Sequence, residues 1–271
     1  MNSAVRRYLL IFGACVLLAA SAVAGTYAYQ SIAQSAANET RGFFNGGVVH
    51  DDFLEPNKDV YVENSSRSVI YTRIRLDEYM EVGTVSLIAD ADINDMSSWT
   101  PHIPDACEED CGLDFHSYWA WVMGGQKWYM PATAQERATG LAENNGIFDE
   151  HSPGAKQTQN AVVLTMEDWK ALGSPSGAYW VIDTDGWCYW AAPLLPGEAT
   201  GLLLDAVNLL RKPLDGYYYA INVVAQIATK DGTDKKGNPY NYASFGDGSG
   251  RDHTWTADGR ALMEMIVVLG S

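Results

Sequence analysis

Cysteine and basic residues are scarce in this sequence, and each scarcity excludes a class of protein. Four Cys occur among 271 residues, so disulfides cannot form the framework of the fold and a hydrophobic core has to hold it together. Lys and Arg number 18 against 34 Asp and Glu, which gives a formal charge of −16. Because an acidic surface repels nucleic acids and anionic lipids, we expect no nucleic-acid partner.

The short motifs of common enzyme classes are also missing. The five His show no His-Glu-x-x-His arrangement, and the chain contains no Gly-x-Ser-x-Gly turn and no glycine-rich phosphate loop. No spacing ties a nucleophile, a base and an orienting group together, although active sites can assemble from residues far apart in a chain. The sequence therefore predicts no catalytic residues, and a non-enzymatic protein is favoured over an enzyme.

Only one long apolar run is present, at residues 8–24. Two Arg precede it, no acidic residue occurs in residues 1–28, and small residues follow the run. This order is typical of a secretory signal peptide, with an uncleaved amino-terminal anchor as the alternative. We therefore expect residues 1–28 to be a cleaved signal peptide and the remaining chain to be secreted.

Polar and apolar residues alternate in many short segments of the remaining chain, which is typical of strands with one face on a core. The predicted strands are 59–63, 69–76, 117–122, 127–130, 161–165, 179–182, 187–192 and 217–228. Residues 59–63 are predicted to pair with 69–76, and two hairpins are predicted, 117–122 with 127–130 and 179–182 with 187–192. Many short strands separated by turns predict a mainly β fold, an antiparallel β-sandwich that resembles a jelly roll.

Capping patterns predict two or three short helices within this β fold. Thr133 and Thr165 each precede an acidic residue by three positions and open short helices, and a last helix starts near Thr256. The predicted organisation is a signal peptide at 1–28, an amino-terminal arm at 29–50 and a β-sandwich domain at 51–271. A long insertion is predicted at about 77–178, where the strand pattern is less regular.

Cys107 and Cys111 lie between His102 and His116 and allow three interpretations. A small disulfide loop is the favoured one in an exported protein, with a zinc site and free thiols as the alternatives. The His and Cys spacing is not a standard zinc-finger spacing. Cys188 follows a Trp in an apolar strand and is predicted to be a buried small hydrophobe.

Two other patterns offer a binding function beside a structural one. Residues 183–186 read Asp-Thr-Asp-Gly, which suits a hairpin turn better than a calcium loop because the bidentate Glu of such a loop is missing. No cofactor is therefore predicted, and Ca or Zn remain alternatives. Six Trp on predicted strands are expected mainly in the core, with stacking on glycan as the alternative. They are Trp119, Trp121, Trp128, Trp180, Trp187 and Trp190.

The leader ends in Gly25-Thr26-Tyr27-Ala28-Tyr29, and residues 58–64 read Lys-Asp-Val-Tyr-Val-Glu-Asn. Both stretches resemble those of Gram-positive exported proteins that depend on a SipW-type signal peptidase, the TasA and camelysin (CalY) group. The runs at 59–81, 179–205 and 217–228 are most similar to a longer branch of that group. The resemblance implies cleavage between Ala28 and Tyr29, a β-sandwich, secretion, and a role in surface fibres or the biofilm matrix.

These observations favour an exported cell-surface or biofilm-matrix protein that assembles by adding its arm, from Tyr29 onward, as a strand to a neighbour. Its partners would be copies of itself or other matrix proteins, besides the signal peptidase. A glycan-binding module that grips the cell wall through exposed Trp is the first alternative. A camelysin-like zinc endopeptidase is the second, although no set of zinc ligands carries over from that group.

Overall fold

A computed structural model of the chain gives two compact units, Met1–Ala37 and Asn38–Ser271. The structure describes parts of the second unit only, and these are 47–54, 57–102, 119–123, 126–128, 159–209, 217–230 and 256–270. The predicted signal peptide, its junction at Ala28 and Tyr29, the Cys107–Cys111 segment and the helix predicted at Thr133 lie outside the described residues.

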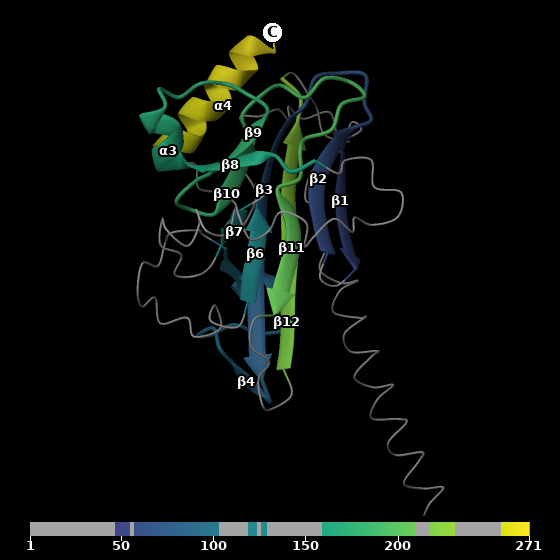
Figure 1. Cartoon of the computed structure of the whole chain (residues 1–271), viewed down its shortest axis with the longest axis vertical. Coiled ribbons are helices and arrows are strands. Elements are labelled where there is room, and N and C mark those ends of the chain that lie inside the picture. The colour runs from purple at the N-terminus through teal and green to yellow at the C-terminus, as the bar shows by residue number, and fades with distance from the viewer. Residues whose placement is uncertain are drawn as a thin grey trace, which may run out of the picture. The chain divides into compact units, whose positions relative to one another are not determined.

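The described strands form two sheets (Figure 1). The five-stranded sheet has the order β1 (Gly47–Leu54), β2 (Asn57–Asn64), β11 (Leu204–Leu209), β6 (Trp119–Met123) and β7 (Gln126–Trp128). The seven-stranded sheet has the order β12 (Tyr217–Ala228), β3 (Tyr71–Val82), β10 (Trp187–Trp190), β9 (Tyr179–Ile182) and β8 (Val162–Thr165), with β4 (Val85–Ser86) and β5 (Thr100–Pro101) also paired to β3.

The main hydrophobic core lies between the two sheets. Val60 and Val62 of β2 contribute to it from one sheet, and Ile74 of β3 and Val223 of β12 contribute from the other. Every second residue of β12 from Ile221 onward belongs to this core, as the alternation in the sequence predicts. The predicted mainly β sandwich with short helices is confirmed. One pair departs from a purely antiparallel pattern, because β8 and β9 run parallel.

Local strand predictions are confirmed where the partner is near in sequence. Residues 119–123 pair with 126–128, and 179–182 pair with 187–190, both as antiparallel hairpins. The predicted pairing of 59–63 with 69–76 is wrong, because β2 pairs with β1 and β11 in one sheet while β3 pairs with β12 and β10 in the other. A connection between two sandwich layers looks the same in sequence as a hairpin loop.

The predicted end of the arm at residue 50 lies within β1, and the predicted start of the insertion at about residue 77 lies within β3. Residues 47–50, expected at the end of the arm, are the first half of β1 and pair with Tyr61–Asn64. The region 77–178, expected to be an insertion, contains the second half of β3, the strands β6 and β7 of the five-stranded sheet, and β8 of the seven-stranded sheet.

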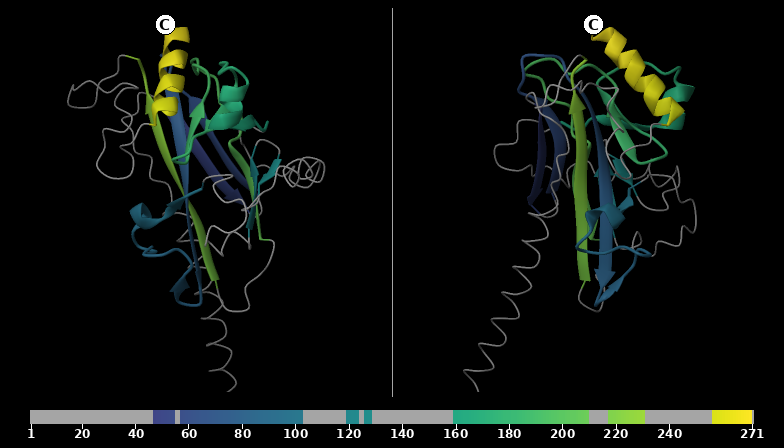
Figure 2. Two further views of the ribbon diagram at one scale, coloured as in Figure 1. Left: turned by 90° about the vertical axis from the view of Figure 1, so that its left-hand side faces the viewer. Right: turned by 180° about the vertical axis from the view of Figure 1, so that it is seen from behind.

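Two α-helices, α3 (Met166–Ala171) and α4 (Ala257–Leu269), cover the outer face of the seven-stranded sheet (Figure 2). Leu262 and Met263 of α4 pack there against Val181 and Val224. The predicted caps are confirmed, since Thr165 and Thr256 each accept a hydrogen bond from a backbone N–H three residues later. A short 3₁₀ turn, η1 (Met96–Ser98), precedes β5. None of the helices in the described part of the chain is long and apolar enough to span a membrane.

The cap of α4 also ties the helix to the β9–β10 turn. Thr256 Oγ1 accepts from Gly259 N at 2.8 Å and donates to a carboxylate oxygen of Asp183, a residue that is 2 % exposed. We expect Thr256→Ala to lower the free energy of unfolding by about 2 kcal/mol, because both the cap and a bond to a buried carboxylate are lost. Thr165→Ala, which removes an exposed cap and a bond to the exposed carboxylate of Asp168, is expected to lower it by about 1 kcal/mol.

Urea denaturation of the two variants followed by circular dichroism measures this difference. Thr256→Ser keeps the hydroxyl and is the control for the lost methyl group. Equal destabilisation by Thr256→Ala and Thr165→Ala would show that the bond to Asp183 contributes nothing.

Candidate functional site

The backbone hydrogen bonds of β3 show which residues of β12 face away from the seven-stranded sheet. Leu76 O accepts from His102 N at 2.7 Å, so the backbone of Leu76 points toward β5 and away from β12. Val223 lies opposite Leu76, and the two residues form a non-hydrogen-bonded pair of the antiparallel ladder. The N–H and C=O of Val223 therefore point away from β3. By the same alternation, the outward backbone groups of β12 belong to Ile221, Val223, Ala225 and Ile227.

The hydrogen bonds of β2 show in the same way which backbone groups of β1 face outward, at the end of the described five-stranded sheet. Val62 O accepts from Thr200 N, and Val60 O accepts from Leu203 N, each at 2.8 Å. Both carbonyls therefore point away from β1. The residues opposite on β1 direct their backbone groups outward, and they are Val49 and Asp51, together with Gly47 at the start of the strand.

These two edges lie on the same side of the sandwich. β1 contacts β12, and a Cβ atom built on Gly47 would lie 2.8 Å from Ile227, so the backbone passes close to that side chain. Within the described ranges β12 pairs only with β3, and β1 pairs only with β2. We call this edge the open side, defined by the outward backbone groups of Gly47, Val49 and Asp51 on β1 and of Ile221, Val223, Ala225 and Ile227 on β12.

The open side can accept an extended segment of another chain. Among the described residues these N–H and C=O groups have no partner strand, and they repeat every second residue, which is the pattern that an added strand recognises. Ile221, Val223 and Ala225 are between 1 and 7 % exposed as whole residues, so such a contact would use main-chain hydrogen bonds and would first have to displace the atoms that lie over this edge. The sequence predicted assembly through a sheet edge, but the edge itself could not be identified before the pairing of β12 was known.

A buried polar cluster lies on the outer face of the seven-stranded sheet. Arg73 is 0 % exposed; its Nε donates to Gln226 Oε1 at 2.8 Å, its Nη1 donates to Tyr189 Oη at 3.2 Å, and its guanidinium lies 4.0 Å from the centre of the Trp187 ring. Burial raises the pKa of Tyr189, which keeps the phenol protonated as the partner of Arg73.

A second guanidinium shares the same Trp ring. Arg75 forms a two-pronged ion pair with Asp77, at 2.8 and 3.0 Å, and its Cζ lies 5.1 Å from the Trp187 ring centre. The alternation in 69–76 predicted a half-buried strand, yet both Arg are buried because helix α4 covers much of this face. No local signal in the sequence distinguishes an Arg under a helix from an Arg in water.

His102, predicted as a candidate zinc ligand, contacts a carboxylate. Its Nδ1 lies 2.7 Å from Glu78 Oε2, and Tyr219 Oη donates to Glu78 Oε1 at 2.5 Å. Glu78 is 0 % exposed and His102 is 4 % exposed. A buried carboxylate flanked by an imidazole and a phenol can hold or pass a proton. Among the described residues no group of three or more His, Cys, Asp or Glu is arranged to hold a metal ion.

The Asp183–Gly186 segment forms the turn of the β9–β10 hairpin, as predicted. Gly186 N donates to Asp183 O at 3.0 Å, and Gly186 has a φ of +84°, which favours glycine. Asp185 Oδ1 accepts from Trp187 N at 3.1 Å, and burial raises the pKa of the Asp185 carboxyl. Both carboxylate oxygens of Asp183 and Oδ1 of Asp185 therefore accept bonds from neighbouring donors, whereas Asp185 Oδ2 is buried with no donor among the described residues.

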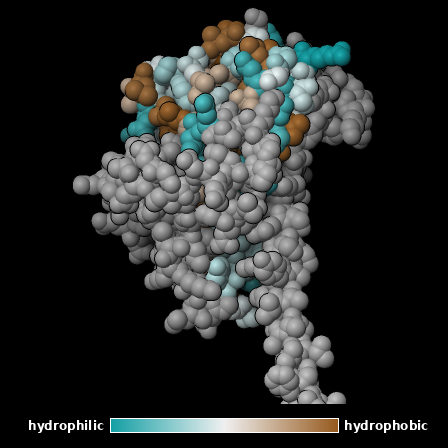
Figure 3. Space-filling view, turned by 45° about the vertical axis from the view of Figure 1, so that its right-hand side comes forward, coloured by the Kyte–Doolittle hydropathy of each residue, from teal (hydrophilic) through white to brown (hydrophobic). Residues whose placement is uncertain are grey.

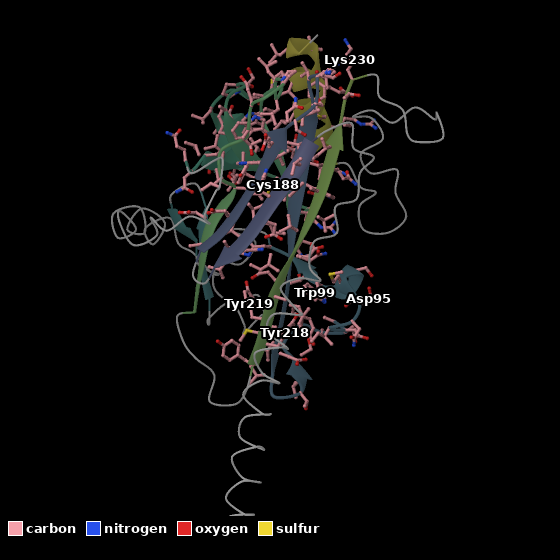
Figure 4. All side chains as sticks on the ribbon, turned by 90° about the vertical axis from the view of Figure 1, so that its right-hand side faces the viewer. Asp95, Trp99, Cys188, Tyr218, Tyr219 and Lys230 are labelled. Atoms are coloured by element: carbon pink, nitrogen blue, oxygen red, sulfur yellow. The ribbon has the colours of Figure 1, made fainter. Side chains whose placement is uncertain are left out.

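The Trp residues with described side chains fill the interior. Trp180, Trp187 and Trp190 are between 0 and 5 % exposed, and the rings of Trp180 and Trp190 pack edge to face at 5.3 Å. The side chains of Trp119, Trp121 and Trp128 lie outside the described part. Cys188 is free and buried as predicted, and burial raises the pKa of its thiol (Figure 4).

On the face drawn in Figure 3, the apolar side chains of the described residues lie among hydrophilic ones. The large apolar residues that are exposed come from several elements, with two adjacent ones at the end of α4, and they are Val48, Val85, Val162, Leu172, Leu195, Val268 and Leu269. Scattered apolar residues of this kind are normal on soluble domains and define no ligand site.

Comparison of the chain with protein-family models, with curated proteins and with solved structures finds no match. Function therefore has to be inferred from the sequence and the geometry of the chain itself. Of the features described, the open side is the one whose backbone groups are arranged to bind another strand.

Proposed function

We propose that this protein is an exported, non-enzymatic component of the cell surface or biofilm matrix that assembles by strand addition at its open side. The observation that carries the proposal is that β1 and β12, on the same side of the sandwich, each pair on one side only among the described strands. The secretory pattern of residues 1–28 and the resemblance to SipW-dependent proteins support export.

The proposed donor is the amino-terminal arm of a second copy. Residues 29–41 are longer than a typical strand of about 5–6 residues, so they are sufficient to cover one edge. Four outward residues on β12 offer about eight hydrogen-bonding groups, and each bond formed contributes on the order of 1 kcal/mol. Strand addition of this kind uses main-chain hydrogen bonds and needs no side-chain pocket. It is therefore compatible with a β12 strand whose alternate side chains are packed in the core.

Cleavage between Ala28 and Tyr29 would control this assembly. Before cleavage the arm is tied to an apolar leader, and afterwards Tyr29 becomes a free amino end that can reach a neighbour. A signal peptidase of the SipW type is the proposed processing partner. Other matrix proteins with an extended segment are the alternative donors, because main-chain recognition depends little on sequence.

Electron microscopy of the mature protein, beside a version that lacks residues 29–41, tests the proposal. We expect the mature protein to form fibres and the shortened version to stay monomeric, because it keeps both edges but has no donor strand. Circular dichroism of both proteins shows whether the sandwich is intact. Equal polymerisation of the two would end the proposal.

A further inference from the structure

A lysine and an aspartate meet inside the sandwich, next to the open side. Asp51 of β1 lies opposite Val60 of β2, and Lys58 is two residues from Val60 on the same face of β2. Long side chains in such a diagonal position can touch across an antiparallel pair. Lys58 Nζ is in direct contact with Asp51 Oδ1, and the two side chains are only 8 % and 4 % exposed.

The surroundings of this pair oppose its ionised form. The neighbouring positions on the inner face of β2, Val60 and Val62, belong to the hydrophobic core and are 0 % exposed. Burial of a charged pair costs several kcal/mol per ion unless other groups compensate it. Desolvation lowers the pKa of Lys58 to about 7, so the neutral amine is accessible at physiological pH. A neutral, desolvated lysine amine is a nucleophile.

We propose that Lys58 and Asp51 join through an amide bond between Lys58 Nζ and Asp51 Cγ, formed by the folded protein itself. The proposal goes beyond the proposed assembly and does not depend on it. It assigns a covalent modification to a pair that no pattern in the sequence singles out.

The reaction needs no other reagent. Within the pair, a proton moves from the ammonium to the carboxylate, which gives a neutral amine beside a carboxylic acid. The Nζ lone pair attacks Cγ, a C–N bond forms, and the tetrahedral intermediate carries one hydroxyl, one negatively charged oxygen and a positively charged nitrogen. A proton passes from this nitrogen to the hydroxyl, the C–O bond to that oxygen breaks as the other oxygen re-forms the carbonyl, and water leaves. The ion pair is thereby converted into an amide and one water molecule, without any change in oxidation state.

The cross-link would fix β1 to β2 at the edge of the five-stranded sheet. Both buried charges disappear, which removes their desolvation cost. β1 could then not be displaced by an incoming strand, so a partner would have to add beside the edge instead of replacing β1. A covalent hairpin also keeps the outward groups of Val49 and Asp51 in place.

Intact mass spectrometry of the purified, folded protein tests the proposal. The expected mass is about 18 Da below that calculated from the sequence, because one water is lost. Tryptic mapping is expected to show no cleavage after Lys58 and a peptide whose fragments join Lys58 to Asp51. Lys170 and Asp258 are the matched control, since they pair at 2.7 Å but are 51 % and 46 % exposed. That pair should stay unlinked.

Two variants distinguish this bond from any other dehydration. Asp51→Ala is expected to have its full calculated mass. Asp51→Asn is expected to keep the cross-link but to lose ammonia, about 17 Da, in place of water. The full calculated mass for the folded wild-type protein, or a water loss that maps to other residues, would overturn the proposal. The wild-type measurement decides this even if a variant fails to fold.

Discussion

Replacement of Ala225 by proline is expected to abolish fibre formation while leaving the sandwich folded. Ala225 lies opposite Ile74, and its N–H points away from β3, so proline at this position removes no bond from the ladder. It does remove a donor from the open side and places a ring where an added strand would lie. Electron microscopy counts the fibres, and thermal unfolding followed by circular dichroism reports the fold.

The matched control is proline one residue earlier. Val224 lies opposite Arg75 with its N–H in the ladder, so Val224→Pro is expected to lower stability by about 3 kcal/mol or more. Because Ala225 is 1 % exposed, some overpacking by the ring is expected, on the order of 1 kcal/mol. Normal fibres from a folded Ala225→Pro protein would show that β12 is not the accepting edge.

Arg73→Ala is expected to lower the free energy of unfolding by about 3–5 kcal/mol, the largest effect expected of any single side chain in the buried polar cluster. The substitution leaves Gln226 Oε1 and Tyr189 Oη without the donor they contact, and it removes the cation from the face of Trp187. Urea denaturation, followed by Trp fluorescence and circular dichroism, measures the change.

Two further variants make this result interpretable. Arg67 is exposed in the loop between β2 and β3, so Arg67→Ala is expected to change stability by less than about 0.5 kcal/mol. Arg73→Lys keeps the charge but not the planar group that stacks and donates in two directions, and it should fall between the other two. A loss below about 1 kcal/mol for Arg73→Ala would show that the cluster contributes little to stability.

Structure that depends on near neighbours was readable from the sequence. The β9–β10 hairpin, in which Trp180 lies opposite Trp190, was predicted from a short turn between two alternating segments. The helix starts at Thr165 and Thr256 follow from capping patterns. The stripe of apolar residues along 217–228 identified the core face of β12 correctly, because the side-chain period of a strand is two residues.

What the sequence could not reveal depends on residues that are far apart in the chain. β3 pairs with β12, about 150 residues later, and this long-range pairing decides that β2 belongs to the other sheet and that β12 is an edge. The same pairing and the cover of α4 bury Arg73 and Arg75, whose alternation alone predicted a half-buried strand.

The sequence by itself determined an acidic chain with the periodicity of a β-sandwich, and its amino-terminal pattern is typical of a signal peptide, because composition, charge and local period are properties of neighbouring residues. Only the tertiary structure decided which of the described strands lie at the sheet edges, and which lysine meets which buried aspartate. These outcomes depend on strand order and on burial. Both are set by packing between distant segments, and no local pattern encodes them.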